Sequence, residues 1–166
     1  MEIKTDRLYI GNLQPDDWMD MKKIFTDFTS SKYSIYDWPL PTEDSKVKEV
    51  TEQFVNSGLF FTVHLLDSDE MIGYVCFHVS EGKYDLGYCF HSLYHSKGYA
   101  FEAAKALILY LNKECNVKIF ISGTALANTP SCRLLKRLGF HLVKVETASF
   151  YEGSSFEGGS FILEFK

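Results

Sequence analysis

The sequence predicts an α+β fold, a mixed arrangement in which about four helices flank a mostly antiparallel sheet of about six or seven strands. Residues 59–66, 71–79 and 84–90 are rich in β-forming residues and are separated by short polar turns, which is typical of an antiparallel meander. Beyond residue 95, helical and strand patterns alternate instead. A strand–helix alternation joined to a meander implies a mixed sheet.

The first half of the chain contains a strand and two helices before the meander. Residues 6–13 have a strand pattern, and residues 15–25 form a helix that begins at a proline and an aspartate. Residues 42–58 form a second helix, whose first-turn acids face the positive end of its dipole and which Gly58 ends. Between the two helices, residues 29–41 are aromatic and irregular, so we expect a loop there.

The second half begins with a helix over residues 98–112, in which apolar residues recur on one face. The pattern continues with a strand, a helix and two strands, at residues 117–125, 128–138, 142–150 and 160–165. We find no repeat, low-complexity tract or linker, so we expect one domain over residues 1–166.

The composition argues against several classes of protein. A net charge of −5 disfavours binding to nucleic acid, which needs a basic surface over many phosphates. The sequence has no run of about 18 apolar residues and no basic-then-apolar start, so we expect no membrane span, no secretory signal and a cytoplasmic location. The four cysteines form no C-x-x-C pair, and we expect reduced, half-buried structural thiols.

A candidate anion-binding turn lies between a predicted strand and a predicted helix, where His95 to Ala100 read His-Ser-Lys-Gly-Tyr-Ala. A helix start presents unpaired N–H groups and a partial positive charge. Gly98 has no Cβ to keep a bulky anion away, and Lys97 adds a charge. The turn suits a pyrophosphate, although by itself it also fits a plain strand-to-helix turn.

Two segments resemble the GNAT acetyltransferase superfamily. His95 to Ala100 is similar to the Q/R-x-x-G-x-G/A segment that holds the coenzyme A pyrophosphate, with His95 in the place of Gln or Arg. Residues 127–140, which read ANTPSCRLLKRLGF, resemble a second segment of the superfamily that carries Asn, Ser, Leu and a final Gly-Phe. Together with Asp-Leu-Gly-Tyr at residues 85–88, they resemble the branch of ribosomal-protein N-terminal acetyltransferases.

The resemblance implies a splayed GNAT-like sheet and an enzyme that transfers an acetyl group directly from acetyl-CoA, its co-substrate, to a primary amine in a ternary complex. The residues implied for coenzyme binding are Cys89, Phe90, His91, His95, Ser96, Lys97, Gly98, Tyr99, Ala100, Asn128 and Arg133. Backbone amides near Cys89, Phe90 and His91 are expected to bond the pantetheine arm or the thioester carbonyl. No metal is expected, because His91 and His95 have no third ligand nearby in the sequence.

The resemblance also implies an acid and a base. Asp85 occupies a position that is usually Glu in this branch and is the expected general base, with Glu81 and His78 as alternatives. Ser131 matches a serine proposed to protonate the leaving thiolate, and Tyr151 is its alternative.

The acceptor is expected to lie against residues 29–41. Tyr33, Tyr36, Trp38, Phe150 and Tyr151 suit either an aromatic wall for an amine or a core. A peptide N-terminus, a polyamine and an amine-bearing antibiotic stay open as acceptors. A different class also stays open, a non-catalytic acyl-CoA-binding sensor or inactive paralogue. We expect a monomer or homodimer, in which aromatic strands near the C-terminus offer edges for pairing.

Overall fold

One sheet runs through the whole molecule. The computed structural model describes residues 1–149 and 153–166, and within them eight strands follow the order β1-β2-β3-β4-β5-β6-β8-β7. The strands are β1 (Glu2–Lys4), β2 (Leu8–Asn12), β3 (Phe60–Leu65), β4 (Met71–Ser80), β5 (Lys83–Phe90), β6 (Ile119–Ala125), β7 (His141–Ser149) and β8 (Ser155–Glu164). Neighbours are antiparallel except β5 and β6, which confirms the predicted meander and mixed sheet.

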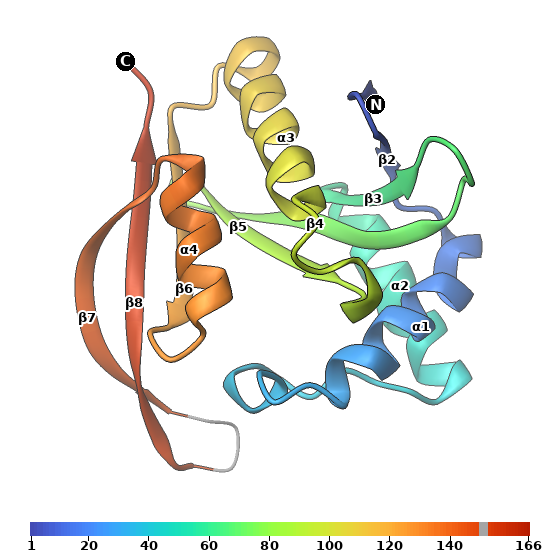
Figure 1. Ribbon diagram of the computed structural model, residues 1–166, viewed down its shortest axis with the longest axis horizontal. Coiled ribbons are helices and arrows are strands. Elements are labelled where there is room, and N and C mark those ends of the chain that lie inside the picture. Colours follow the sequence, from blue (N-terminus) through green and yellow to red (C-terminus); the bar gives the residue numbers. More distant parts are fainter. Residues whose placement is uncertain (150–152) are drawn as a thin grey trace.

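Helices cover both faces of the sheet (Figure 1). The α-helices of the described residues are α1 (Trp18–Thr29), α2 (Asp44–Ser57), α3 (Tyr99–Cys115) and α4 (Thr129–Leu138). α1 and α2 pack on one face, where Phe25 and Val47 join a buried cluster with Phe60 of β3. α3 and α4 contribute to the cluster on the other face, which includes Leu107 and Leu135. The sheet is thus buried between two apolar layers, and its functional groups have to lie at an edge or a gap.

Two strands differ from the sequence prediction. β1 was not predicted and raises the strand number to eight, because three residues are too few to show an alternating pattern; pairing with β2, in the register Ile3↔Ile10, defines it. β8 begins five residues before the predicted start at residue 160. Gly158 and Gly159 disguise that part of the strand, since glycine is rare in strands. A Cβ on Gly159 would come within 2.7 Å of Leu126, so close packing explains that glycine.

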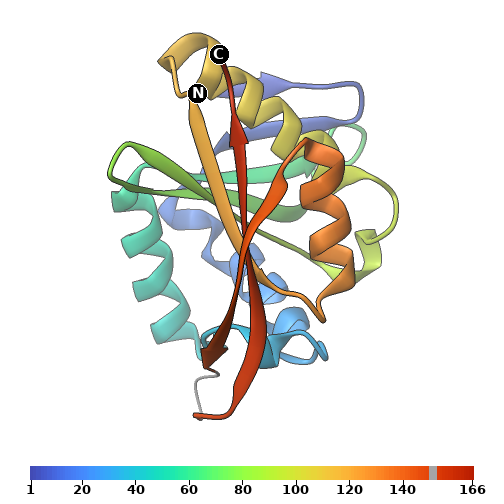
Figure 2. The same cartoon turned by 90° about the vertical axis from the view of Figure 1, so that its left-hand side faces the viewer.

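The sheet is splayed between β5 and β6. Their pairing is limited to Tyr84↔Phe120 and Asp85↔Ile121, and the Ser122 hydroxyl then donates to the Leu86 carbonyl at 2.9 Å. Farther along β5 the two strands separate, and Figure 2 shows β6, β7 and β8 running steeply across the direction of the other strands. The resemblance implied this gap, and the gap exposes the outer edge of β5.

One of the two C-terminal strands forms an edge of the described sheet. β7 is the last strand in the order, whereas β8 lies between β6 and β7 with Phe161 buried in the core, so β8 offers no free edge for a second chain. Phe156 instead contacts the Tyr36 ring, with the ring centroids 5.3 Å apart. All four cysteines are free, as predicted, although Cys115 is exposed rather than half-buried. None of the helices described is at once long and apolar enough to cross a membrane.

Candidate active site

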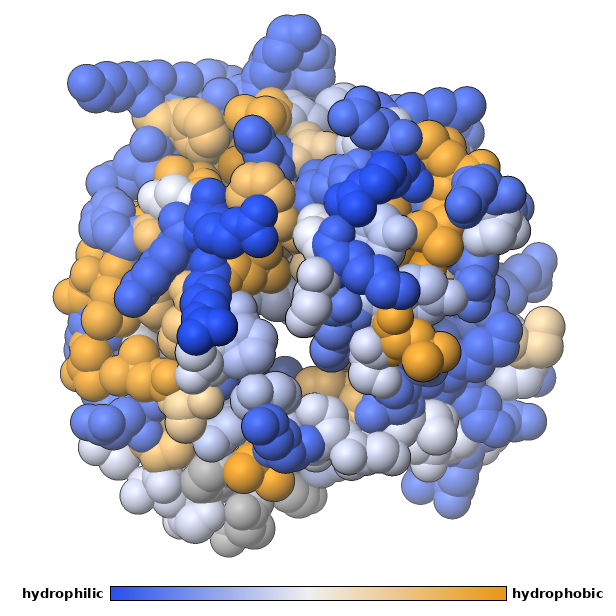
Figure 3. Space-filling view, viewed as in Figure 1, coloured by the Kyte–Doolittle hydropathy of each residue, from blue (hydrophilic) through white to orange (hydrophobic). Residues whose placement is uncertain are grey.

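A cavity of about 550 Å³ occupies the gap between β5 and β6. Its walls come from β5 and β6, from the start of α3, from α4, and from the segment between α1 and α2. In the space-filling view the molecule is hollowed near its centre, and hydrophilic side chains gather on both sides of the opening (Figure 3). The cavity therefore joins the predicted phosphate turn to the aromatic segment expected to hold the acceptor.

The predicted phosphate turn has the backbone that it needs. Gly98 is the N-cap of α3 with a φ of +84°, in the left-handed region that glycine adopts at little cost. Ser96 also has a positive φ, of +61°. The N–H groups of Tyr99, Ala100 and Phe101 belong to the first helical turn and have no intrahelical acceptor. Because these three residues line the cavity, the turn presents its donors and its positive dipole end to the open space.

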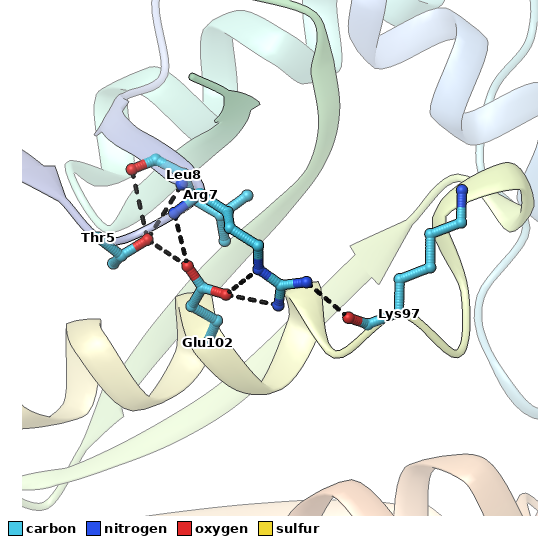
Figure 4. Close-up of polar contacts among 5 residues, drawn as sticks. All are labelled: Thr5, Arg7, Leu8, Lys97 and Glu102. Atoms are coloured by element: carbon cyan, nitrogen blue, oxygen red, sulfur yellow. Dashed lines mark hydrogen bonds and ion pairs between the residues drawn. The ribbon is translucent and has the colours of Figure 1, made fainter. Parts of the chain in front are cut away.

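An ion pair ties this turn to the start of the chain (Figure 4). The Arg7 guanidinium lies 2.6 Å from the Glu102 carboxylate, and its Nη1 donates to the Lys97 carbonyl at 3.0 Å. The Thr5 hydroxyl donates to the same carboxylate at 2.6 Å. Arg7 also stacks over the Tyr99 ring at 4.4 Å. The network neutralises the acid in the first turn of α3 and fixes the phosphate turn against the β1–β2 connection.

The Glu102 carboxylate gives this network a pH dependence. Burial raises its pKa, but hydrogen bonds from Thr5 and Arg7 outweigh burial and leave the pKa below its ordinary value of 4.5. A carboxyl whose folded pKa is lowered adds stability above its unfolded pKa and loses it as pH falls through the folded value. We expect Glu102→Gln to lower the Tm at neutral pH, and the difference from wild type to shrink below about pH 4.5. Thermal melts down to about pH 3.5 measure this. The exposed Glu52→Gln is the control, and a difference that stays constant with pH would contradict the assignment.

The register of β5 decides which of its amides face the gap. The His91 N–H donates to the Ile72 carbonyl on β4 at 3.0 Å. The direction of backbone hydrogen bonds alternates along an antiparallel strand. The Cys89 amide therefore also faces β4, whereas the amides of Tyr88 and Phe90 face the gap. Of the three amides expected to bond the coenzyme, only the Phe90 amide faces the gap. The Tyr88 amide, which was not predicted, also faces the gap.

His95, which stands where the family pattern has Gln or Arg, hydrogen-bonds to the protein backbone. Its Nε2 lies 2.7 Å from the Phe90 carbonyl oxygen. Because a carbonyl only accepts, Nε2 carries the proton and donates. The ring thus occupies the outward-facing carbonyl at the end of β5 and holds the phosphate turn to that strand.

A hydrogen bond spans the gap on the α3–α4 side. The Tyr88 hydroxyl lies 2.7 Å from the Ser131 hydroxyl in the first turn of α4. The Ser131 N–H donates to the side chain of Asn128, the N-cap of that helix, at 3.3 Å. Burial raises the pKa of Tyr88 to about 12, although the bond to Ser131 opposes the shift. Tyr88 therefore carries its proton at neutral pH.

Titratable groups also gather on the opposite face, toward α1 and α2. Asp85 pairs across the strands with His78, and alternation puts its side chain on the same face as Cys89. Burial raises the pKa of Asp85, and nearby His78 lowers it in part. Burial also raises the pKa of Cys89 to about 12, with the charges of Asp37 and Asp27 adding to the shift. β5 thus presents on this face the carboxyl of Asp85, with raised basicity, and the protonated thiol of Cys89.

Most of the predicted site residues meet at the cavity. All of the expected coenzyme contacts line it except His91 and Lys97, and Ser131 lines it as well. The His91 ring instead accepts from the Leu93 N–H at 3.3 Å and lies 3.7 Å from the Asp27 carboxylate. Asp85 does not line the cavity, but Gly87, the next residue on its face, does. Tyr151 and Phe150 lie outside the described residues. Within the described residues, no group of three or more His, Cys, Asp or Glu is placed to hold a metal ion.

Among the cavity residues that the sequence analysis did not name as site residues, Asp37, Tyr88 and Arg137 have side chains suited to bind a ligand or move a proton. Asp37 lies in the aromatic loop, where a single acid resembles any solvated turn residue. Tyr88 belongs to a motif that was recognised, but its partner is 43 positions away. Arg137 could have been predicted from the sequence, because it is four residues from the predicted Arg133 and therefore lies on the same face of the helix. Its guanidinium lies over the Phe101 ring at 4.5 Å, at the mouth of the phosphate turn.

Comparison with known proteins gives the family. The profile of the acetyltransferase (GNAT) domain matches residues 7–141. The uncharacterized N-acetyltransferase YnaD of Bacillus subtilis (strain 168) is 34% identical over 141 residues, which cover 84% of this chain and 82% of the relative. A GNAT-family acetyltransferase from Bacillus anthracis has a TM-score of 0.86 at 23% identity, over 99% of this chain and 98% of that one. RimL, a ribosomal L7/L12 alpha-N-protein acetyltransferase solved with coenzyme A, has a TM-score of 0.87 at 14% identity, over 99% of this chain and 98% of its own. With a profile match over most of its length and a relative that shares a third of the aligned residues, the chain belongs to the GNAT acetyltransferase family.

Proposed function

We propose that this protein is an acetyl-CoA-dependent N-acetyltransferase that transfers the acetyl group directly to a primary amine in a ternary complex. One observation carries the proposal: a single cavity connects the start of α3 with the aromatic segment between α1 and α2. A coenzyme and an acceptor that approach from these two sides would meet in the gap between β5 and β6. Such positioning of two reactants supplies much of the rate enhancement in a transfer reaction.

The residues around the phosphate turn fit coenzyme A. Gly98 leaves the first-turn N–H groups of α3 open to a pyrophosphate, with no Cβ in the way. Arg133 and Arg137 face the same cavity from α4 and add positive charge for phosphates. When bound, acetyl-CoA supplies an activated acetyl group. The amides of Phe90 and Tyr88 are the backbone donors that β5 presents to a thioester carbonyl.

Asp85 is the proposed general base. It lies on the α1–α2 face, two residues from Gly87, which is about 7 Å along a strand. That distance suits a proton path through water. Gly87 leaves room for the packed Cys76 Sγ, which would lie within 2.8 Å of a Cβ at this position. The raised pKa of Asp85 makes it a stronger base than an exposed aspartate, and it takes a proton from the acceptor ammonium.

Ser131 is the proposed general acid, and it acts on the opposite face. Its hydroxyl proton goes to the thiolate as the carbon–sulfur bond breaks, and Tyr88 replaces that proton through the bond between them. Tyr151 stays the alternative acid. Amine deprotonation and thiolate protonation thus occur on the two sides of the gap, which keeps the base and the acid from neutralising each other.

The cysteine at the cavity supports direct transfer over an acetyl-enzyme intermediate. Cys89 lines the cavity, but its raised pKa of about 12 keeps the thiol protonated at neutral pH. A thiol is a poor nucleophile compared with a thiolate. The cavity therefore offers no activated cysteine within its described walls, and the amine itself is the proposed nucleophile.

The test is calorimetric titration with acetyl-CoA, followed by release of the coenzyme thiol against peptides, polyamines and aminoglycosides. We expect binding, with thiol release that depends on the amine. Binding without release from any amine would favour the acyl-CoA sensor, and an absence of binding would overturn both functions. A cytoplasmic location, one domain over residues 1–166, and a monomer or homodimer stay predictions.

A further inference from the structure

The segment between α1 and α2 brings one carboxylate to the acceptor side of the cavity. The segment contains the short helix η2 (Ser34–Tyr36), and Tyr33, Tyr36 and Asp37 line the cavity opposite β5. Contact between the Tyr36 and Phe156 rings holds the segment against β8. The charge of Asp37 helps to raise the pKa of Cys89, which lines the same cavity from β5.

No cationic side chain of residues 1–149 and 153–166 neutralises the charge of Asp37. Its carboxylate accepts from the Trp38 N–H at 2.9 Å. Within the described part of the chain, no lysine, arginine or histidine forms an ion pair with it. The residue as a whole is exposed, although partial burial of its carboxyl raises its pKa. A carboxylate in such a setting gains from an incoming cation.

A second depression, of about 270 Å³, begins at the same residue. Asp37 and Phe28 line both hollows, and the rest of the depression is mostly apolar, with Trp38, Pro39 and Leu40 on its wall. The Asp37 carboxylate thus lies between the inner cavity and the apolar depression. A ligand that binds the carboxylate and also fills the depression needs a positive charge next to an apolar group.

We propose that Asp37 binds the ammonium group of the acceptor, and that the depression beside it takes a bulky apolar substituent carried next to that amine. This inference rests on the proposed acetyl transfer and narrows its substrate class. It favours monoamines with an aromatic or branched side group, or peptides whose first residue has one. Polyamines and aminoglycosides fit poorly, because their further charges and hydroxyls would have to enter the apolar hollow.

The experiment compares wild type, Asp37→Asn and Trp38→Ala with 2-phenylethylamine, ethanolamine and spermidine as probes. Wild type is expected to have its highest kcat/KM for 2-phenylethylamine. Asp37→Asn should raise the KM for this amine roughly tenfold to a hundredfold, with the affinity for acetyl-CoA unchanged. Trp38→Ala should reduce the preference for 2-phenylethylamine over ethanolamine roughly tenfold, since it removes part of the apolar wall.

The control for charge is Asp16→Asn, which changes the net charge equally but alters an exposed residue on the 3₁₀ helix η1 (Pro15–Asp17). Its KM should equal that of wild type. A KM for Asp37→Asn that matches this control, or a wild-type preference for spermidine, would overturn the inference while acetyl transfer stands. If wild type acetylates none of the amines, calorimetric titration of 2-phenylethylamine into the protein–acetyl-CoA complex still tests the inference. Binding that is weaker in Asp37→Asn than in wild type would support the role of Asp37. An absence of binding, or equal binding to both proteins, would overturn it.

Discussion

Asp85→Asn is expected to lower kcat by about 10²–10⁴-fold and to leave the affinity for acetyl-CoA unchanged. The substitution keeps the shape of the side chain but removes the group that takes the proton of the acceptor. It also removes a half-buried charge whose pKa burial raises. A carboxyl whose folded pKa is raised stabilises the fold less once pH exceeds that pKa. We therefore expect the Tm of Asp85→Asn at neutral pH to equal or exceed that of wild type, so that lost activity cannot be ascribed to unfolding.

The pH profile adds a second readout for the same residue. A base has to be ionised, so kcat/KM of wild type should fall as pH decreases through the pKa of Asp85. Because burial raises this pKa above 3.8, the fall should begin at a higher pH than an exposed aspartate would give. Asp67→Asn, on the exposed turn before β4, is the matched control and should behave as wild type. If Asp85→Asn keeps full turnover, the base is another group, and Glu81 and His78 are the next to test.

Gly98→Asp is expected to weaken the binding of acetyl-CoA by about 100-fold or more. The new carboxylate would stand at the N-terminus of α3, where the proposed pyrophosphate needs the helix dipole and free N–H groups. Two charges about 4 Å apart repel by about 4 kcal/mol at the effective dielectric constant of a protein surface. The Cβ itself would make no clash, since its nearest neighbour would be Arg7 Nη2 at 3.4 Å, so the cost in stability comes from the left-handed backbone.

The chain supplies a close control for this substitution. Gly58 ends α2 with a φ of +72°, and nothing lies within 4 Å of a Cβ placed there. Gly58→Asp therefore creates the same side chain on a similar left-handed backbone, away from the cavity. Both variants should lose stability, because an L side chain is strained on a left-handed backbone, and thermal melts measure this loss. The loss should be larger in Gly58→Asp, whose carboxylate lies at the negative end of a helix dipole. Calorimetry should find lost coenzyme affinity only in Gly98→Asp. Equal affinity in the two variants would place the phosphates elsewhere.

Local sequence signals predicted most of the fold and the turn at the start of α3. Strand alternation, helical periodicity and end signals such as Asn128 and Gly139 located the helices and nearly all of the strands, because these signals arise between residues a few positions apart. The same local signals identified the phosphate turn at Gly98. The turn requires a particular backbone and a helix start, and both can be recognised in a short segment.

Which groups face one another depends on contacts between residues that are far apart in the sequence. Arg7 and Glu102 are 95 positions apart, and no local pattern indicates that they pair. Strand register determined that Phe90 and Tyr88, rather than Cys89 and His91, turn their amides to the gap. Packing of the loop between α1 and α2 brought Asp37 to the wall of the cavity. Such contacts depend on long-range packing, which a periodic sequence permits but does not specify. The position of Asp37 and the bond between Tyr88 and Ser131 could therefore not be predicted from the sequence.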